Sequence, residues 1–369
     1  MSAAKCSRNS RFAIRVAHFI MNEYSATADR KREHIELCTG DNVRFTAKTA
    51  GFERYSFVHN ALPELNFDEI SVDTDFLGKK LQMPLLISCM TGGCGEAERI
   101  NAQLAEAAER CGVAIGVGSQ RQALENGIYH GSFAIVRRNA PSVPIIGNIG
   151  GDSLTGGKLP DVDVLVRLID ADAIAVHLNP LQELLQPEGN PRYRGVLDGI
   201  VRLVRESPVP VIVKEVGAGL SRGAGRRLLE AGVAALDCAG AGGTSWAGVE
   251  ILRHGETLRK QEQNSLDYFW NWGIPTAECI RGLAPLKNEY GFTLIGSGGI
   301  TNGVEAATAL ALGADITAAA RPFLQAVSAG GSELLVNTIR QWQLDIRRIM
   351  FLTGAKTPTA LCSSLICAG

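Results

Sequence analysis

From residue 84 onward, the chain alternates between short apolar runs and longer segments in which apolar residues recur at helical spacing. The apolar runs cover residues 84–90, 113–119, 143–149, 172–178, 209–216, 233–240, 292–299 and 314–320. Continuous rather than alternating apolarity predicts strands that are buried on both faces, as in parallel sheets covered by helices. Eight β–α units predict an α/β fold of the (β/α)8 TIM barrel type, with a doubly wound sheet as the alternative.

The segments between the runs carry helix signals. Ala97, Ile100 and Leu104 recur at spacings of three and four residues, which predicts one helix face. Ser221 precedes a helical segment as a predicted N-cap, and Gly232 is its predicted stop. Residues 328–355 are predicted to form the last helix of the barrel.

The remaining chain divides into flanking segments. We expect residues 1–29 to be a tail, either disordered or the product of an over-extended start, with Met21 as the alternative start. Residues 30–83 are expected to fold over the mouth of a barrel spanning 84–355, and residues 356–369 to form a C-terminal tail. A transit peptide is the less favoured interpretation of the basic, acid-poor start.

Composition excludes several classes of protein. The 37 basic and 38 acidic residues nearly cancel, so no global field attracts nucleic acid, and we expect no nucleic-acid partner. No apolar stretch of about 20 residues is free of charge, which argues against a membrane span. The nine cysteines are irregularly spaced and contain no C-x-x-C pair, so we expect a reducing, cytoplasmic location.

Glycine is over-represented, with 41 residues, and many glycines follow the predicted strands. In TIM barrels the active site lies at the carboxyl ends of the strands, where glycine allows close backbone approach to a ligand. The segments GSGGI (296–300) and AAARP (318–322) follow the seventh and eighth runs, where barrels bind phosphate. Tight turns alone are the alternative explanation for such glycines.

Lys214 ends the fifth run, where an unpaired ammonium would be costly. It is therefore expected to face an anionic or electron-rich ligand, or to pair with Glu215 or Asp237. Together with the phosphate signal, this lysine points to FMN, because it could stabilise negative charge at N1 and O2 of the reduced flavin.

Two further clusters suggest a diphosphate and a metal ion. The segments 30–32 and 119–121 are basic or polar and could clamp a diphosphate, although a basic triplet is more often a solvated face. The segment 177–183 places neutral polar groups and Glu183 after the fourth run, and Mg²⁺ prefers one or two carboxylates plus phosphate oxygens. Zinc ligands and a serine triad are not evident, so hydrolysis is poorly supported.

These motifs resemble the FMN-dependent type 2 isopentenyl-diphosphate isomerase family from about residue 30 to residue 352. The segments that carry the resemblance are RKREHI (30–35), ISCMTGG (87–93), GVGSQR (116–121), NIGG (148–151), HLNPLQELLQPEGN (177–190), VKEVGAGLSR (213–222), LDCAGAGGTSWAGVE (236–250), WGIPTAE (272–278) and GSGGI (296–300). Asn190, Ala318 and Cys279 stand where the family usually has Asp, Gly and Ser.

The resemblance implies interconversion of isopentenyl and dimethylallyl diphosphate with FMN, Mg²⁺ and NADPH as the flavin reductant, in a homo-oligomer that is a tetramer or octamer. It implies a catalytic role for Gln182 and a magnesium ligand in Glu183. The implied substrate-binding residues are Arg30, Lys31, His34, Ser119, Gln120, Arg121, His177, Asn179 and Gln182. The implied FMN-binding residues are Met90, Thr91, Gly92, Gly93, Ser119, Asn148, Lys214, Thr244, Gly298, Gly299, Ala320 and Arg321.

Moving a double bond adds one proton and removes another without net oxidation. We assign protonation to reduced FMN at N5, and proton movement on the other side of the substrate to Gln182 or a flavin-bound water. Three alternatives remain: a flavoenzyme of the same fold acting on another prenyl diphosphate, a 2-hydroxy-acid dehydrogenase, and a non-catalytic flavin-binding scaffold. The dehydrogenase would need a catalytic His, with an Arg that holds a carboxylate, late in the barrel, and we expect no such pair after the sixth or seventh run.

Overall fold

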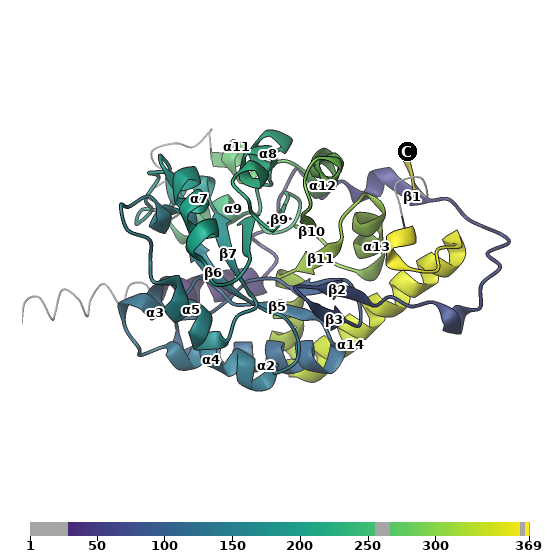
Figure 1. The fold of residues 1–369 in the computed structure, drawn as a ribbon, viewed down its shortest axis with the longest axis horizontal. Helices are drawn as coiled ribbons and strands as arrows, with labels where there is room; N and C mark the ends of the chain where they lie inside the picture. Colours follow the sequence, from purple (N-terminus) through teal and green to yellow (C-terminus); the bar gives the residue numbers. More distant parts are fainter. Residues whose placement is uncertain (1–28, 255–265, 362–365, 369) are drawn as a thin grey trace, which may run out of the picture.

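The computed structural model describes residues 29–254, 266–361 and 366–368 (Figure 1). Eight parallel strands form a closed barrel, and each strand pairs with the next one along the chain until the last pairs with the first. The strands are β4 (Leu85–Ile87), β5 (Ala114–Gly116), β6 (Ile145–Gly150), β7 (Ala173–Leu178), β8 (Val211–Glu215), β9 (Ala235–Asp237), β10 (Thr293–Ser297) and β11 (Ile316–Ala319). Each strand overlaps one predicted apolar run, and only β6 extends beyond its run, by Gly150. The closed order of the strands confirms the TIM barrel and rules out the doubly wound sheet.

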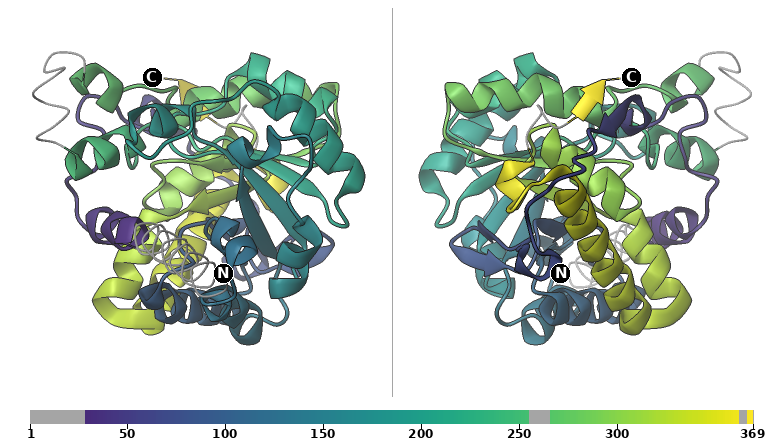
Figure 2. Two further views of the ribbon diagram at one scale, coloured as in Figure 1. Left: turned by 90° about the vertical axis from the view of Figure 1, so that its left-hand side faces the viewer. Right: turned by 90° about the vertical axis from the view of Figure 1, so that its right-hand side faces the viewer.

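Helices surround the barrel (Figures 1 and 2). They are α2 (Gly95–Cys111), α3 (Arg121–Glu125), α4 (His130–Asn139), α5 (Val162–Ile169), α6 (Pro180–Leu185), α7 (Val196–Glu206), α8 (Arg222–Glu230), α9 (Trp246–Arg253), α11 (Leu266–Trp270), α12 (Thr276–Leu283), α13 (Gly303–Ala311) and α14 (Arg321–Thr353). Ser221 caps α8 by accepting a hydrogen bond from the backbone N–H of Ala224, as predicted.

The last helix, α14, starts at Arg321, seven residues before the predicted start at 328. Its first turn accommodates Pro322 because the N–H that proline lacks has no helical partner there. Gly330 and Gly331 interrupt the helical backbone and divide the element in two. The first part belongs to the barrel, since Phe323 and Leu324 are buried in the core.

The segment 30–83 does not lie over the barrel mouth as one unit, contrary to expectation. A helix over residues 29–39 lies beside α14, and Gln325 of α14 donates a hydrogen bond to the Thr39 carbonyl (Figure 2). Residues 43–50 then run along the loop after β9, with backbone hydrogen bonds from Phe45 to Gly243 and from Ser245 to Val43.

The rest of that segment lies away from the mouth. The hairpin of β2 (Thr74–Phe76) and β3 (Lys79–Leu81) places Phe76 and Leu81 in one cluster with inward-facing residues of the barrel strands. Because β3 leads directly into the start of β4, the hairpin lies at the amino-terminal end of the barrel. Only the first part of the segment can therefore contribute to a site at the carboxyl ends.

The last described strand pairs with an early strand outside the barrel. β1 (Tyr55–Phe57) pairs antiparallel with β12 (Ile366–Ala368). The tail expected over residues 1–29 lies outside the described residues except for Asp29. None of the described helices is long and apolar enough to cross a membrane.

Candidate active site

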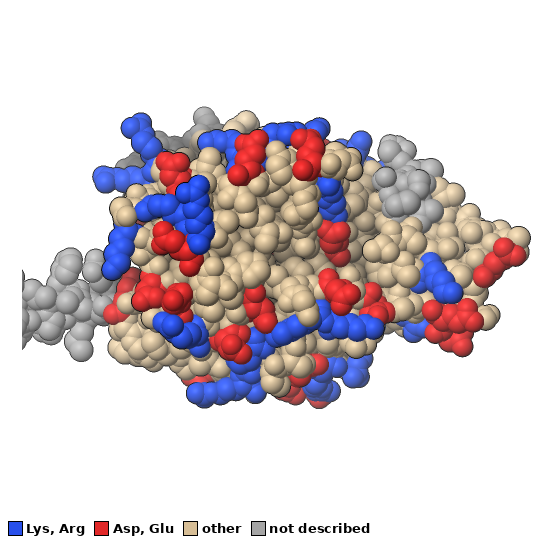
Figure 3. Space-filling view, viewed as in Figure 1, with Lys and Arg blue, Asp and Glu red and all other residues tan. Residues whose placement is uncertain are grey.

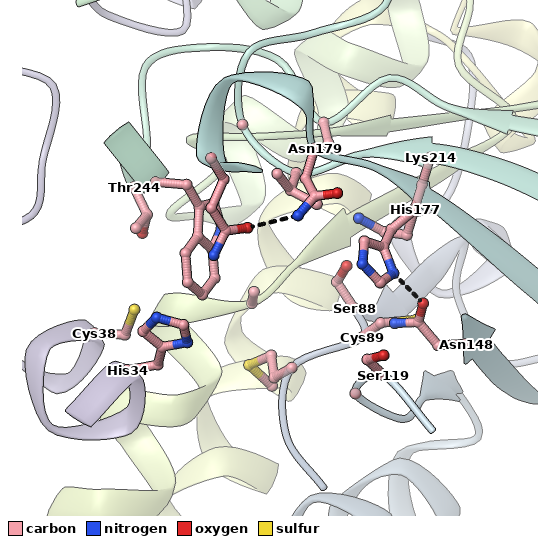
Figure 4. A pocket seen from close by; sticks show the side chains of 18 of the residues that line it. His34, Cys38, Ser88, Cys89, Ser119, Asn148, His177, Asn179, Lys214 and Thr244 are labelled. Carbon is pink, nitrogen blue, oxygen red and sulfur yellow. Dashed lines mark hydrogen bonds between the residues drawn. The ribbon is translucent and has the colours of Figure 1, made fainter. Parts of the chain in front are cut away.

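A cavity of about 310 Å³ lies at the carboxyl ends of the barrel strands. The helix over residues 29–39 borders it on one side with His34 and Cys38, and strand-end residues such as Lys214, His177 and Asn148 stand on the other side (Figure 4). Loops after all eight strands contribute to its lining, as a TIM-barrel active site requires.

Most of the predicted site residues line this one cavity. They are Arg30, Lys31, His34, Met90, Thr91, Gly92, Ser119, Arg121, Asn148, His177, Asn179, Gln182, Glu183, Lys214, Thr244, Gly298, Gly299, Ala320 and Arg321. Gly93 and Gln120 are not among the lining residues. Gln120 is fully buried, where its amide donates to the Leu165 carbonyl and accepts from the Asn148 N–H. It holds β6 in place instead of facing a ligand.

Lys214 lies at the end of β8 with only 6% of its surface exposed. Its ammonium donates to the Glu215 carbonyl at 2.6 Å and lies 3.8 Å from the Asp237 carboxylate. Asp237 in turn accepts a hydrogen bond from the Ser297 hydroxyl. Both expected partners of Lys214 are therefore present, although Glu215 uses its backbone carbonyl and not its carboxylate. Lys214 also lines the cavity.

His177, beside Lys214 on the neighbouring strand, is neutral. Burial, together with the nearby charge of Lys214, lowers its pKa to about 3. The Asn148 amide nitrogen donates to the Val117 carbonyl, so its oxygen faces His177 Nδ1 at 2.9 Å (Figure 4). Nδ1 consequently carries the proton, and Nε2 is left with a lone pair.

Gln182 is buried at the start of α6 and is held from both ends. Its carbonyl oxygen accepts from the Asn179 amide at 3.1 Å, and its NH₂ donates to Glu250 at 2.9 Å. The same Asn179 amide donates to Glu183 at 2.9 Å, so one residue orients both neighbours. Such fixed geometry is what a group acting on a substrate needs.

Glu250 is completely buried on α9 and remains ionised. Burial raises its pKa, but hydrogen bonds from His34 and Gln182 and the charge of Arg253 outweigh that effect and lower the pKa to about 2. The Arg253 guanidinium donates to the second Glu250 oxygen at 2.6 Å. Sequence reasoning missed both residues, although an acid four residues after Trp246 in an otherwise apolar helix signals a paired, buried charge.

Three cations converge on one wall of the cavity. Arg30 and Lys31 come from the helix over 29–39, and Arg121 begins α3, where it pairs with Asp152. Burial lowers the pKa of Lys31 to about 8, although its ammonium donates to the Gly92 carbonyl at 2.6 Å. Burial also lowers the pKa of Arg30, and Arg121 lowers it further. This mutual repulsion favours an anionic ligand.

The opposite side of the cavity fits a phosphate. Gly298 has φ +104°, and a Cβ atom there would collide with the Gly240 carbonyl, so only glycine is accommodated. Gly299 and the first residues of α14, including the buried Arg321, line the same region. A helix amino terminus with a cation provides N–H donors and positive charge for a phosphate. With Lys214 across the cavity, these residues fit FMN.

Glu183 fits a magnesium ion shared with substrate. Its two oxygens accept from the Asn179 amide and, at 2.6 Å, from the Asn190 backbone N–H, which fixes the carboxylate at the cavity. Within the described residues, no group of three His, Cys, Asp or Glu side chains could hold a metal by itself. One oriented carboxylate suits Mg²⁺ that takes its other ligands from phosphate and water.

Two of the three departures from the family pattern, Asn190 and Ala318, line the cavity. The Asn190 contact to Glu183 uses the backbone, so asparagine in place of aspartate preserves it. Ala318 is buried and lines the cavity, and Cys279 is buried with its thiol at the Ile274 carbonyl.

Arg253 and His254 adjoin at the end of α9, after the sixth run, but they are not the substrate-binding pair that the dehydrogenase alternative needs. Neither residue lines the cavity. The Arg253 guanidinium is engaged by Glu33, Glu188 and Glu250, so it is not available to a substrate carboxylate.

The fold and the site define a flavin-binding barrel enzyme. The model of the FMN-dependent dehydrogenase family matches residues 25–128 and 194–368, which is more than half of the chain. Among solved structures, the flavin-binding domain of baker's yeast flavocytochrome b2 superposes with a TM-score of 0.65 at 16% identity, covering 89% of this chain and 79% of that one. A mandelate oxidase superposes with a TM-score of 0.59 at 16% identity, covering 87% and 90%. These structures share the fold.

Curated relatives specify the family. An isopentenyl-diphosphate delta-isomerase of Pelodictyon phaeoclathratiforme is 48% identical over 90% of this chain and 95% of its own length. Enzymes of the same name from Chlorobaculum parvum and Pseudescherichia vulneris are 48% and 47% identical, over 92% and 89% of this chain and 98% and 93% of theirs. The chain belongs to the isopentenyl-diphosphate delta-isomerase family, of the FMN-dependent type.

Proposed function

We propose that this protein converts isopentenyl diphosphate to dimethylallyl diphosphate in an FMN- and Mg²⁺-dependent reaction without net redox change. One observation carries the proposal: a single cavity joins the cation cluster of Arg30, Lys31 and Arg121 to the fixed amide of Gln182. The names of the relatives support the same substrate.

The residues divide the work as follows. Arg30, Lys31 and Arg121 bind the diphosphate, and Glu183 would hold a magnesium ion that offsets the charge of the diphosphate. Gln182 lies at the hydrocarbon end, where Asn179 and Glu250 hold its amide. Gln182 is itself buried, with its amide held between Asn179 and the ionised Glu250, and this burial limits the access of water to a carbocation-like intermediate.

When bound and reduced by NADPH, the flavin supplies an electron-rich acid/base beside the substrate double bond. Lys214 would hold the edge of the flavin on which negative charge develops, and Asn148, Thr91 and Thr244 would bind the ring system. Gly298, Gly299 and Arg321 would hold its phosphate. We further propose a homo-oligomer, a tetramer or octamer, which mass photometry would measure directly.

The decisive assay is anaerobic incubation with isopentenyl diphosphate, FMN, Mg²⁺ and NADPH, with each component omitted in turn. We expect dimethylallyl diphosphate in the complete mixture, none without FMN or NADPH, and less without Mg²⁺. NADPH should be consumed only to the extent of the flavin present. Consumption of NADPH equal to the amount of product would indicate a dehydrogenase instead. If the enzyme turned over longer prenyl diphosphates faster than isopentenyl diphosphate, one of those longer compounds would be the preferred substrate.

A further inference from the structure

Gln122 is a buried amide in the cavity wall for which the described part of the chain supplies no partner. Its side chain is 2% exposed, and neither Oε1 nor Nε2 makes a hydrogen bond. Buried polar groups are nearly always paired, because an unpaired amide loses its hydration without compensation. Gln122 nevertheless lines the cavity, so a bound ligand can provide the partner.

The position of Gln122 points to the diphosphate end. It follows Arg121 in α3, and a Cβ atom on Gly93 would collide with both Gln122 Oε1 and Lys31 Nζ. The amide carbonyl and the ammonium therefore approach the same point above Gly93. Glycine there, with φ +79°, leaves the space that these two polar ends occupy.

The hydrogen-bonding capacity of these groups sets the direction of the amide. Lys31 has three N–H donors, and two of them reach the Gly92 and Ser119 carbonyls, at 2.6 and 3.3 Å. With the amide oxygen beside the Lys31 ammonium, the Gln122 NH₂ group is the end that is left to donate to a ligand. Phosphate oxygens accept hydrogen bonds and do not donate them when ionised, so they match this group.

We propose that Gln122 is a further substrate-binding residue, whose NH₂ group donates to an oxygen of the diphosphate held by Arg30, Lys31 and Arg121. The proposal rests on the proposed function for the identity of the ligand. A bound diphosphate would supply the hydrogen-bond partner that the Gln122 amide lacks. Gln122 would add a neutral donor beside the three cationic side chains.

The test compares FMN-loaded wild type, Gln122→Leu and Gln122→Glu by calorimetric titration with inorganic pyrophosphate and with isopentenyl diphosphate. Leucine has a similar size and cannot donate, and we expect it to raise both Kd values about tenfold, as for loss of a hydrogen bond to a charged group. Glutamate is isosteric but anionic and should weaken binding further. In turnover, KM should rise while kcat changes little.

Flavin content and melting temperature should match wild type in both variants. A Gln341→Leu variant, at an exposed position of α14, is the control and should also match wild type. Unchanged Kd values in both variants would overturn the inference. It would also be overturned if both variants lost FMN or stability in proportion to ligand affinity, since Gln122 would then serve the fold. Wild type that binds pyrophosphate without isomerising substrate would contradict the proposed function, while the pyrophosphate titrations would still test Gln122.

Discussion

Lys214 is the residue whose surroundings most directly define the cavity as a flavin site. Its ammonium is offset by Asp237 at 3.8 Å, yet it remains at the cavity surface. A charge that is partly balanced can be buried without a ligand and can still attract one. This balance explains how the site tolerates a buried lysine before FMN arrives.

Lys214→Ala should weaken FMN binding at least tenfold and make the bound flavin harder to reduce. Removal of the cation leaves negative charge on the reduced ring uncompensated, and we expect a potential more negative by about 30 mV, equivalent to about 1.4 kcal/mol for a two-electron couple. Flavin absorbance after gel filtration and a dye-coupled reductive titration measure the two effects. Lys80→Ala, at an exposed lysine paired with Asp73, is the control. Normal flavin content and potential would refute this role.

Gln182→Asn should lower kcat about a hundredfold with FMN still bound. Asparagine is one methylene shorter, so its amide cannot meet Asn179 and Glu250 in the same positions, and a displacement near 1 Å can cost this much. Initial rates of dimethylallyl diphosphate formation provide the measurement. Gln341→Asn, at an exposed position of α14, should behave as wild type, and an undiminished rate for the Gln182 variant would remove Gln182 from the mechanism.

We expect kcat/KM to depend on pH through the protonation of Lys31. Its pKa of about 8 in the folded protein lies below its ordinary value of 10.5, mainly because of burial. The ammonium that attracts diphosphate is therefore lost as the pH rises through about 8, and kcat/KM should fall above that pH. The sign for stability is opposite: the cost of the buried charge disappears as the pH rises from about 8 toward 10.5.

A pH–rate profile with isopentenyl diphosphate checks this expectation. Lys31→Arg keeps its charge across the range and should abolish the decline above pH 8, even if its KM is higher. His177 gives a useful contrast, because its pKa of about 3 keeps it neutral throughout the assay range. A decline that persists unchanged in Lys31→Arg would assign it to another group.

Among the elements, the barrel strands were predictable because burial on both faces leaves a continuous apolar signal. The strands β1, β2, β3 and β12 were not predicted, since they have three residues each and form antiparallel pairs outside the barrel. Side chains at the strand ends could be assigned to one site from short sequence motifs, because closure of the barrel brings all of those ends together. The contacts of Glu250, Asp152 and Gln122 depend on how helices and turns rotate against their neighbours, which no local pattern encodes.

In the loop after β10, we expect one added methyl group at Gly298 to destabilise the folded protein strongly. Gly298→Ala would require a positive φ and would push Cβ against the Gly240 backbone, so we expect a loss of about 2–5 kcal/mol of unfolding free energy. FMN binding should weaken as well, because the loop belongs to the phosphate side of the cavity. Urea unfolding and flavin content measure these effects.

Gly223→Ala is the matched control. Gly223 lies inside helix α8, and a Cβ atom there would meet nothing within 4 Å. This variant should be neutral or slightly stabilising, since alanine has the better helix propensity. Equal stability of the two variants would mean that the loop adjusts freely and that glycine is not required at 298.

At the scale of the whole molecule, charge is mixed on the surface and is concentrated in one sign only in the cavity wall. Acidic and basic side chains are interspersed over the face shown in Figure 3, in keeping with a net charge of −1, whereas the cavity wall concentrates Arg30, Lys31 and Arg121. Attraction for an anionic substrate therefore comes from the cavity and not from the surface as a whole. Binding should consequently depend only modestly on salt, because buried pairs are screened much less than exposed ones.

The cavity also couples the whole barrel to its cofactor. Its lining comes from the ends of strands in both halves, from β4 through β11, so FMN would bridge segments more than 200 residues apart. A ligand that binds only the folded state adds about 2.7 kcal/mol at a free concentration of 100 times its Kd. We expect the melting temperature of the flavin-free protein to rise steadily with added FMN, in one transition by calorimetry. Riboflavin, which lacks the phosphate, should stabilise much less. Two transitions, of which FMN moves one, would show that the halves of the barrel unfold separately.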